Sequence, residues 1–310
     1  MSTGATSPGR RFLHVCYCCA ETTDATPLFV DGLAMRCTMS SPTSSQSGST
    51  LGLDGDVVSG ADFVYDARGP RISPAIEVQA WVDPPVVGTP YHDPTAVGVH
   101  ALGFSVPDLG AAVGRLQELG CTALGAGTSP FDTQWVSVRD GTGVTIDLVD
   151  DAAVPVGETR MRHLRITASD LAASLTWYEG LGFSVVDRGT IDDASFLGHD
   201  GVVRADVARL RLPDEPYEVL LVQWHEPRSH GRHYREANHA GLYRAAIGVD
   251  ATRASYEAMS SEGWIFDRAP ASIELTGTPV PDMWICFLSD PDGITYELVE
   301  RPRSVFRPER

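Results

Sequence analysis

The chain has 310 residues, of which 43% are hydrophobic and 8% aromatic, and its formal net charge is −17. This length fits two domains of ordinary size with a sizeable apolar core. The strong negative charge argues against nucleic acid or an anionic membrane surface as a partner.

No apolar run approaches the ~18 residues that cross a bilayer, and the N-terminus lacks the apolar segment of a signal peptide. The six cysteines show neither zinc-like nor disulfide-like spacing. Free thiols of this kind are typical of a reducing compartment, so we expect a cytoplasmic protein.

Along the chain, a strand followed by a helical stretch and further strands recurs. The opening strands are predicted at residues 12–19, 99–106, 162–169 and 242–249. Three of the helical stretches, at 108–120, 170–186 and 251–264, are more extended than the one after the first strand. Apolar residues at three- and four-residue steps give these helices one buried stripe each. The sequence therefore predicts four β-α-β modules.

Two modules end in nearly the same phrase, DGTGVTIDLVD at 140–150 and DPDGITYELVE at 290–300. Each phrase reads as a glycine-containing turn that leads into a strand. Asp147 and Glu297 then occupy equivalent positions within apolar strands. A carboxylate in such a place costs free energy unless it is paired or bound to a cation.

Two segments are expected to be irregular. Residues 38–50 are rich in Ser and Thr and read as a loop. Residues 225–239 contain four histidines, and a solvated crossover is favoured there over a metal-binding tract.

The residues that carry a family resemblance are His163 at the start of a strand, Asp170, the sequence WYEGLGF at 177–183 and the phrase at 290–300. His100 and TIDLVD repeat part of this pattern in the second module. With these features the chain resembles the vicinal oxygen chelate superfamily, which includes glyoxalase I, bleomycin-binding proteins and extradiol dioxygenases.

The resemblance implies an α+β fold of four βαβββ modules in two tandem glyoxalase-like domains, with mixed curved sheets and helices outside. We expect residues 1–152 and 158–303 to form these domains, each from two consecutive modules. A superfamily of this breadth fixes the fold more closely than the reaction.

The resemblance also implies a divalent metal ion held by the first and last strands of paired modules. In the first pair the matching residues are His14, Glu77, His100 and Asp147, with Gln79 as an alternative to Glu77. Two imidazoles and one or two carboxylates suit Fe²⁺, Mn²⁺, Ni²⁺ or Zn²⁺.

In the second pair the matching positions read His163, Leu220, Tyr243 and Glu297. Leucine cannot bind a metal, so this second pocket is expected to be metal-free. Arg165 shares a strand face with His163 and is expected to pair with Glu297.

The function favoured by these features is a metalloenzyme that acts on a small oxygen-chelating substrate, with lyase or isomerase chemistry and Glu77 or Asp147 as the catalytic carboxylate. One alternative is an Fe²⁺ dioxygenase built on His14, His100 and Asp147. Another is a non-catalytic drug- or metabolite-binding resistance protein. The expected state is a monomer or homodimer with no nucleic-acid or membrane partner.

Overall fold

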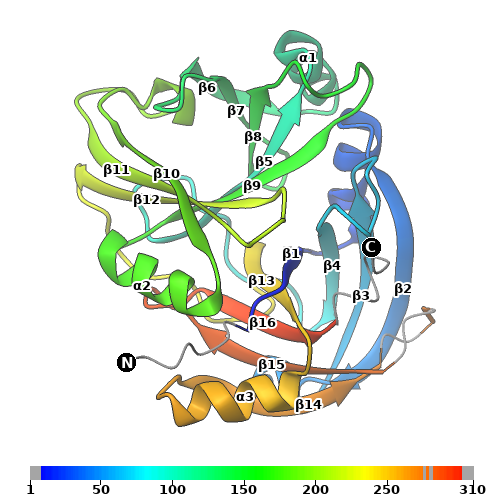
Figure 1. The fold of residues 1–310 in the computed structure, drawn as a ribbon. Coiled ribbons are helices and arrows are strands. Elements are labelled where there is room, and N and C mark those ends of the chain that lie inside the picture. Colours follow the sequence, from blue (N-terminus) through cyan, green and yellow to red (C-terminus); the bar gives the residue numbers. More distant parts are fainter. Residues whose placement is uncertain (1–7, 275–276, 279–281, 302–310) are drawn as a thin grey trace.

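A computed structural model describes residues 8–274, 277–278 and 282–301. Its strands form two curled, mixed sheets of eight strands each (Figure 1). This arrangement confirms the predicted α+β architecture of βαβββ modules.

The first sheet, called sheet one, combines the first and fourth modules. In spatial order its strands are β14 (Phe266–Ile273), β15 (Met283–Ser289), β16 (Thr295–Glu300), β13 (Gly241–Val249), β1 (Arg11–Cys19), β4 (Ala75–Asp83), β3 (Asp56–Tyr65) and β2 (Arg36–Ser47).

The other sheet, called sheet two, combines the second and third modules. In spatial order its strands are β10 (Ser184–Ile191), β11 (Arg204–Arg211), β12 (Glu218–Glu226), β9 (Arg160–Thr167), β5 (Gly98–Val106), β8 (Thr145–Asp150), β7 (Gln134–Arg139) and β6 (Thr122–Thr128).

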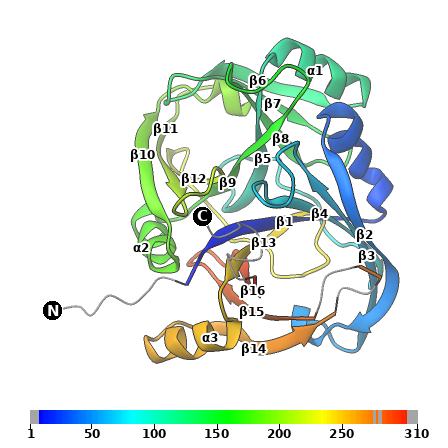
Figure 2. The same ribbon diagram turned by 45° about the vertical axis from the view of Figure 1, so that its right-hand side comes forward.

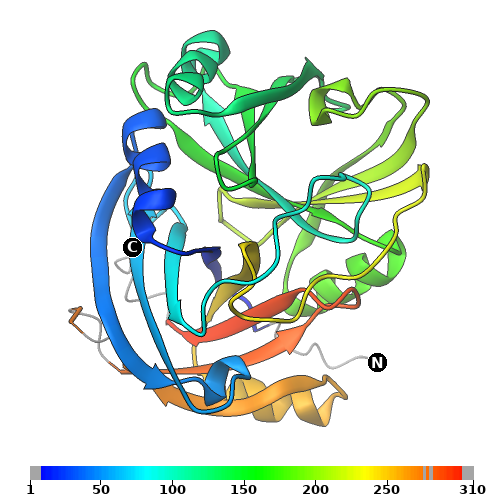
Figure 3. The ribbon, with the colours of Figure 1, turned by 180° about the vertical axis from the view of Figure 1, so that it is seen from behind.

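The expectation that consecutive modules pair within residues 1–152 and within 158–303 is therefore wrong: each sheet takes one module from either range. The connections explain the difference. Residues 151–159 link β8 to β9 directly within sheet two, whereas 84–97 and 227–240 cross from one sheet to the other. The two crossings run side by side (Figure 3), joined by the bridges Val87–His239 and Ala96–His230.

Three α-helices lie among the described residues, α1 (Leu109–Glu118), α2 (Leu171–Leu181) and α3 (Thr252–Ser261). All are on the outer side of the sheets (Figure 2). Asp108 and Asp170 begin α1 and α2 as N-caps, each accepting backbone N–H bonds of the first turn. At the corresponding place the first module has a short 3₁₀ helix at Thr22–Asp24 and a short π-helix at Leu28–Gly32.

The repeated closing phrases are turns held by their first aspartate. Asp140 Oδ1 accepts hydrogen bonds from the backbone N–H groups of residues 142–144, and Asp290 Oδ1 from those of 292 and 294. The other oxygen of each carboxyl accepts a tyrosine hydroxyl, from Tyr17 at 2.6 Å and from Tyr178 at 3.3 Å. Both tyrosines are buried in a core that extends across both sheets.

Residues 38–50 were expected to form a loop, but most of them belong to β2, an edge strand paired with β3. Most of its Ser and Thr residues are exposed, which suits the edge of a sheet. In the described part of the chain, no helix has the length and apolar character that a membrane crossing requires.

Candidate functional site

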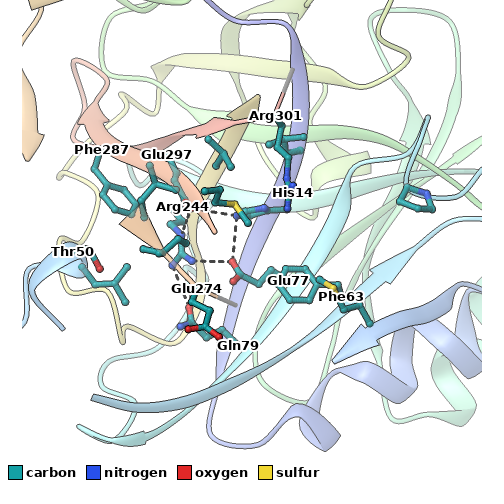
Figure 4. A pocket seen from close by; sticks show the side chains of 18 of the residues that line it. His14, Thr50, Phe63, Glu77, Gln79, Arg244, Glu274, Phe287, Glu297 and Arg301 are labelled. Carbon is teal, nitrogen blue, oxygen red and sulfur yellow. Dashed lines mark hydrogen bonds and ion pairs between the residues drawn. The ribbon is translucent and has the colours of Figure 1, made fainter. Parts of the chain in front are cut away.

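A cavity of about 520 Å³ lies inside the curve of sheet one (Figure 4). Its walls are largely apolar, from Leu13, Met39, Leu51, Phe63, Ile273, Met283, Ile285, Phe287 and Val299. Its floor is polar and comes from the four central strands, β16, β13, β1 and β4. A cavity with this contrast is the usual form of a small-molecule site.

On this floor, one histidine contacts two carboxylates. His14 Nε2 lies 3.3 Å from Glu77 Oε2 and 3.5 Å from Glu297 Oε2. All three side chains are at most 15% exposed.

Arg244 joins the same two carboxylates from β13. Its Nη2 donates to Glu77 Oε2 at 2.9 Å and its Nε to Glu297 Oε2 at 3.2 Å. Burial alone lowers the pKa of Arg244, but its surroundings, including Glu77 and Glu297, raise that pKa well above the ordinary value. Burial likewise raises the pKa of Glu297, yet the hydrogen bond from His14 and the charge of Arg244 bring it below the ordinary value.

Gln79 also lies on the floor, and the buried Cys16 supports it from behind. The amide oxygen of Gln79 accepts from Arg244 Nη1 at 3.2 Å and from the Cys16 thiol at 3.2 Å. Burial raises the pKa of this thiol well above its ordinary value, so Cys16 is a neutral donor here. Gln79 thus holds Arg244 in place.

A register shift at the centre of sheet one decides which side chain of β13 reaches this floor. Two residues of β13, Tyr243 and Arg244, face the single residue Cys16 of β1. Arg244 lines the cavity described above, whereas Tyr243 lines a neighbouring cavity next to Thr295. The prediction placed Tyr243 at the position that Arg244 occupies.

Sheet two brings together a different set. Asp147, His163 and Arg165 are buried in mutual contact. Arg165 donates to both oxygens of Asp147, at 2.7 and 3.2 Å, and His163 Nε2 lies 3.3 Å from Oδ2. Burial raises the pKa of Asp147, but the charge of Arg165 and the hydrogen bonds of His163 and Arg165 lower it strongly. The expected partner of Arg165 was Glu297; its partner is Asp147.

The hydrogen bond and the ring contact of His100 are with residues outside this set. Its Nε2 donates to the backbone carbonyl of Ala96 at 2.6 Å, and its ring packs on Tyr91 at 5.1 Å. His100 occupies a register shift of β5, since Val99 pairs with Ile166 and Ala101 with Arg165. The side chain equivalent to a floor residue on this strand is therefore Ala101.

The structure thus divides the four predicted ligands between two sheets. His14 and Glu77 share the floor of sheet one with Glu297, while His100 and Asp147 lie in sheet two. Arg244 and the positioning role of Gln79 were missed. The available signal was the arginine itself, a charged residue inside the apolar strand LYRAAIGV.

The residues on this floor do not fit the divalent metal that the resemblance implies. Within residues 8–274, 277–278 and 282–301, no three His, Cys, Asp or Glu side chains form a group that could hold a metal ion. The Oε2 atoms of Glu77 and Glu297 that face His14 are also the atoms bound by Arg244. A cation there would meet a charged guanidinium within hydrogen-bonding distance of the same oxygens.

Residues 160–298 match the model of the Glyoxalase/Bleomycin resistance protein/Dioxygenase superfamily. A lactoylglutathione lyase of Schizosaccharomyces pombe is 26% identical over 152 residues, 47% of this chain and 46% of that protein. The chain therefore aligns with about half the length of this relative.

Solved structures extend the likeness in fold to the whole chain. Glyoxalase I from Zea mays superposes with a TM-score of 0.68 and 16% identity, covering 96% of this chain and 93% of that one. A Bacillus subtilis protein described as a dioxygenase has a TM-score of 0.63 and 11% identity, covering 96% and 88%. The chain therefore shares the fold of these proteins, and its residues 160–298 are similar to the superfamily of glyoxalases, bleomycin resistance proteins and dioxygenases.

Proposed function

We propose that the protein is an enzyme that moves a proton on a small oxygen-bearing organic substrate, in lyase or isomerase chemistry, within the cavity of sheet one. The observation that carries this proposal is the convergence of His14, Glu77, Glu297 and Arg244 on the floor of a cavity with largely apolar walls. The similarity to a lactoylglutathione lyase points to the same class of chemistry.

In this proposal the apolar walls bind the carbon body of the substrate, and an oxygen of the substrate points to the floor. The buried guanidinium of Arg244 and the imidazole of His14 supply donors where negative charge develops on that oxygen. Donors fixed in a water-poor cavity stabilise such charge more than water does.

Glu77 is assigned as the general base. A base must be ionised and basic enough to take a proton. The lowered pKa of Glu297 makes it a weak base, so its role here is to hold Arg244 and His14. The triad of His14, His100 and Asp147 supports no dioxygenase proposal, because its members lie in different sheets.

The test is proton exchange and product formation, followed by NMR in D₂O, with a panel of small α-hydroxy and α-keto compounds that includes lactoylglutathione. For any compound that is turned over, Glu77→Gln should lower the rate by about 10²- to 10⁴-fold while ligand binding is retained.

Glu218→Gln is the matched control, because Glu218 is also a buried, arginine-bound glutamate but lies in sheet two, where Arg209 donates to both of its oxygens. Its rate should stay near that of the wild type. Compounds that bind but are turned over by neither the wild type nor Glu218→Gln would instead favour a binding protein. The apolar walls of the cavity also suit such a role.

A further inference from the structure

The four central strands of each sheet repeat one geometric relation. In sheet one, Cys16 pairs with Glu77 across β1 and β4, and Ala246 pairs with Glu297 across β13 and β16. His14 stands two residues before Cys16, and Arg244 two residues before Ala246. Arg244 is therefore the counterpart of His14 in the other half of the site.

The same relation in sheet two gives His163 and Ala101 at the first-strand positions, with Leu220 and Asp147 at the last-strand positions. Two of these four side chains have no atom that can bind a metal. Sheet one instead presents a histidine and two glutamates, with the arginine as the fourth member. Replacement of that arginine by a metal-binding residue would give sheet one four donor side chains.

Arg244 fills the centre of that set. Its guanidinium bridges Glu77 and Glu297, and Gln79 binds its third nitrogen. The side chain is 6% exposed and the raised pKa keeps it charged. The one guanidinium already compensates half of the charge of the two carboxylates, and a divalent ion would meet this fixed positive charge.

We propose that Arg244 is the resident cation of this site, so that the cavity binds and activates its substrate without a divalent metal ion. The inference rests on the proposed function for the location of the substrate, and it adds that a guanidinium supplies the positive charge. Removal of that guanidinium should open a metal site made by His14, Glu77 and Glu297.

The test is metal binding by the full-length protein, with Ni²⁺ and Zn²⁺ titrated separately by calorimetry and the bound metal counted by elemental analysis after dialysis. The wild type should retain no stoichiometric metal. Arg244→His should retain about one equivalent, because two imidazoles and two carboxylates form a suitable donor set. The double variant Arg244→His with His14→Ala should lose it again.

Arg209→His is the control for the chemical change, since Arg209 is also bound to a glutamate but lies outside the cavity. It should bind no more metal than the wild type. Arg244→Gln is the second variant, and circular dichroism verifies the fold of each protein. One equivalent of metal in the wild type that His14→Ala removes would overturn the inference, as would a folded Arg244→His and a folded Arg244→Gln that both bind none.

The two proposals fail separately. Metal binding requires no substrate, so a wild type without metal and without turnover contradicts the proposed function alone. Turnover that a chelator abolishes contradicts the metal-free site alone.

Discussion

Arg244 and Arg165 have the same role in the two sheets. Each holds a buried carboxylate on the last strand of a module, Glu297 in sheet one and Asp147 in sheet two. An isolated carboxylate in either place would cost several kcal/mol. The sequence correctly predicted that these carboxylates are compensated by a partner. It could not distinguish a metal ion from an arginine in that role.

The burial of His100 predicts that the stability of the protein depends on pH. Burial first, and then the charge of Arg165, lower its pKa to about 3. The unfolded chain binds this proton near the ordinary value of about 6.5, while the folded protein binds it only near pH 3. Stability should therefore fall as the pH falls from 6.5 toward 3, by up to about 1.4 kcal/mol per pH unit from this residue.

Urea unfolding at pH 7 and pH 5 checks this expectation. His100→Gln should lose roughly 2 kcal/mol less than the wild type over that interval. His92→Gln is the control, because His92 is exposed, and it should follow the wild type. Equal losses in wild type and His100→Gln would show that His100 does not carry this pH dependence.

Within single strands, β-bulges determine which side chain faces the interior of the sheet. The register shifts at Tyr243 in β13 and at His100 in β5 each place the following residue, Arg244 or Ala101, at the position facing the sheet interior. A slip of one residue exchanges the two faces of a strand. The sequence predicted these strands correctly, but it selected the residue before the one that faces inward in both.

β5 and β9 pack closely at Gly103. A Cβ atom on Gly103 would lie 2.2 Å from the nearest atom of the His163 ring, which is held between Trp135 and Asp147. Gly103→Ala should therefore lower the free energy of unfolding by about 1–3 kcal/mol.

Gly114→Ala is the matched control, because a Cβ there meets nothing within 4 Å and the residue lies within α1. This variant should be unchanged or more stable by up to about 1 kcal/mol, from helix propensity. Equal urea midpoints for Gly103→Ala and the wild type would mean that β5 and β9 are packed less tightly than described.

The pairing of the modules determines which parts of the chain can fold on their own. Each sheet needs strands from both sides of residues 153–157, and one apolar core extends across both sheets. The two halves of the sequence are therefore parts of one cooperative unit.

A division of the chain tests this statement. Fragments 1–152 and 158–310 expressed separately should be unfolded or aggregated, because each leaves the central edges of both sheets unpaired. Expressed together they should form a 1:1 complex with native circular dichroism, detected by size-exclusion chromatography. Two separately folded, monomeric fragments would contradict the pairing of the first module with the fourth.

The amino-acid sequence was sufficient to predict the modules, most of their strands, the glycine-containing turns within 140–150 and 290–300, and the need to compensate Asp147 and Glu297. These features depend on local periodicity, turn chemistry and the cost of burying charge, all of which can be read within a short stretch. The pairing of the modules depends on contacts between distant parts of the chain, and so does the meeting of Arg244 and His14 at Glu77 and Glu297. Equivalent modules offer equivalent edges to one another, and a bulge changes a strand's register without a mark in its apolar pattern.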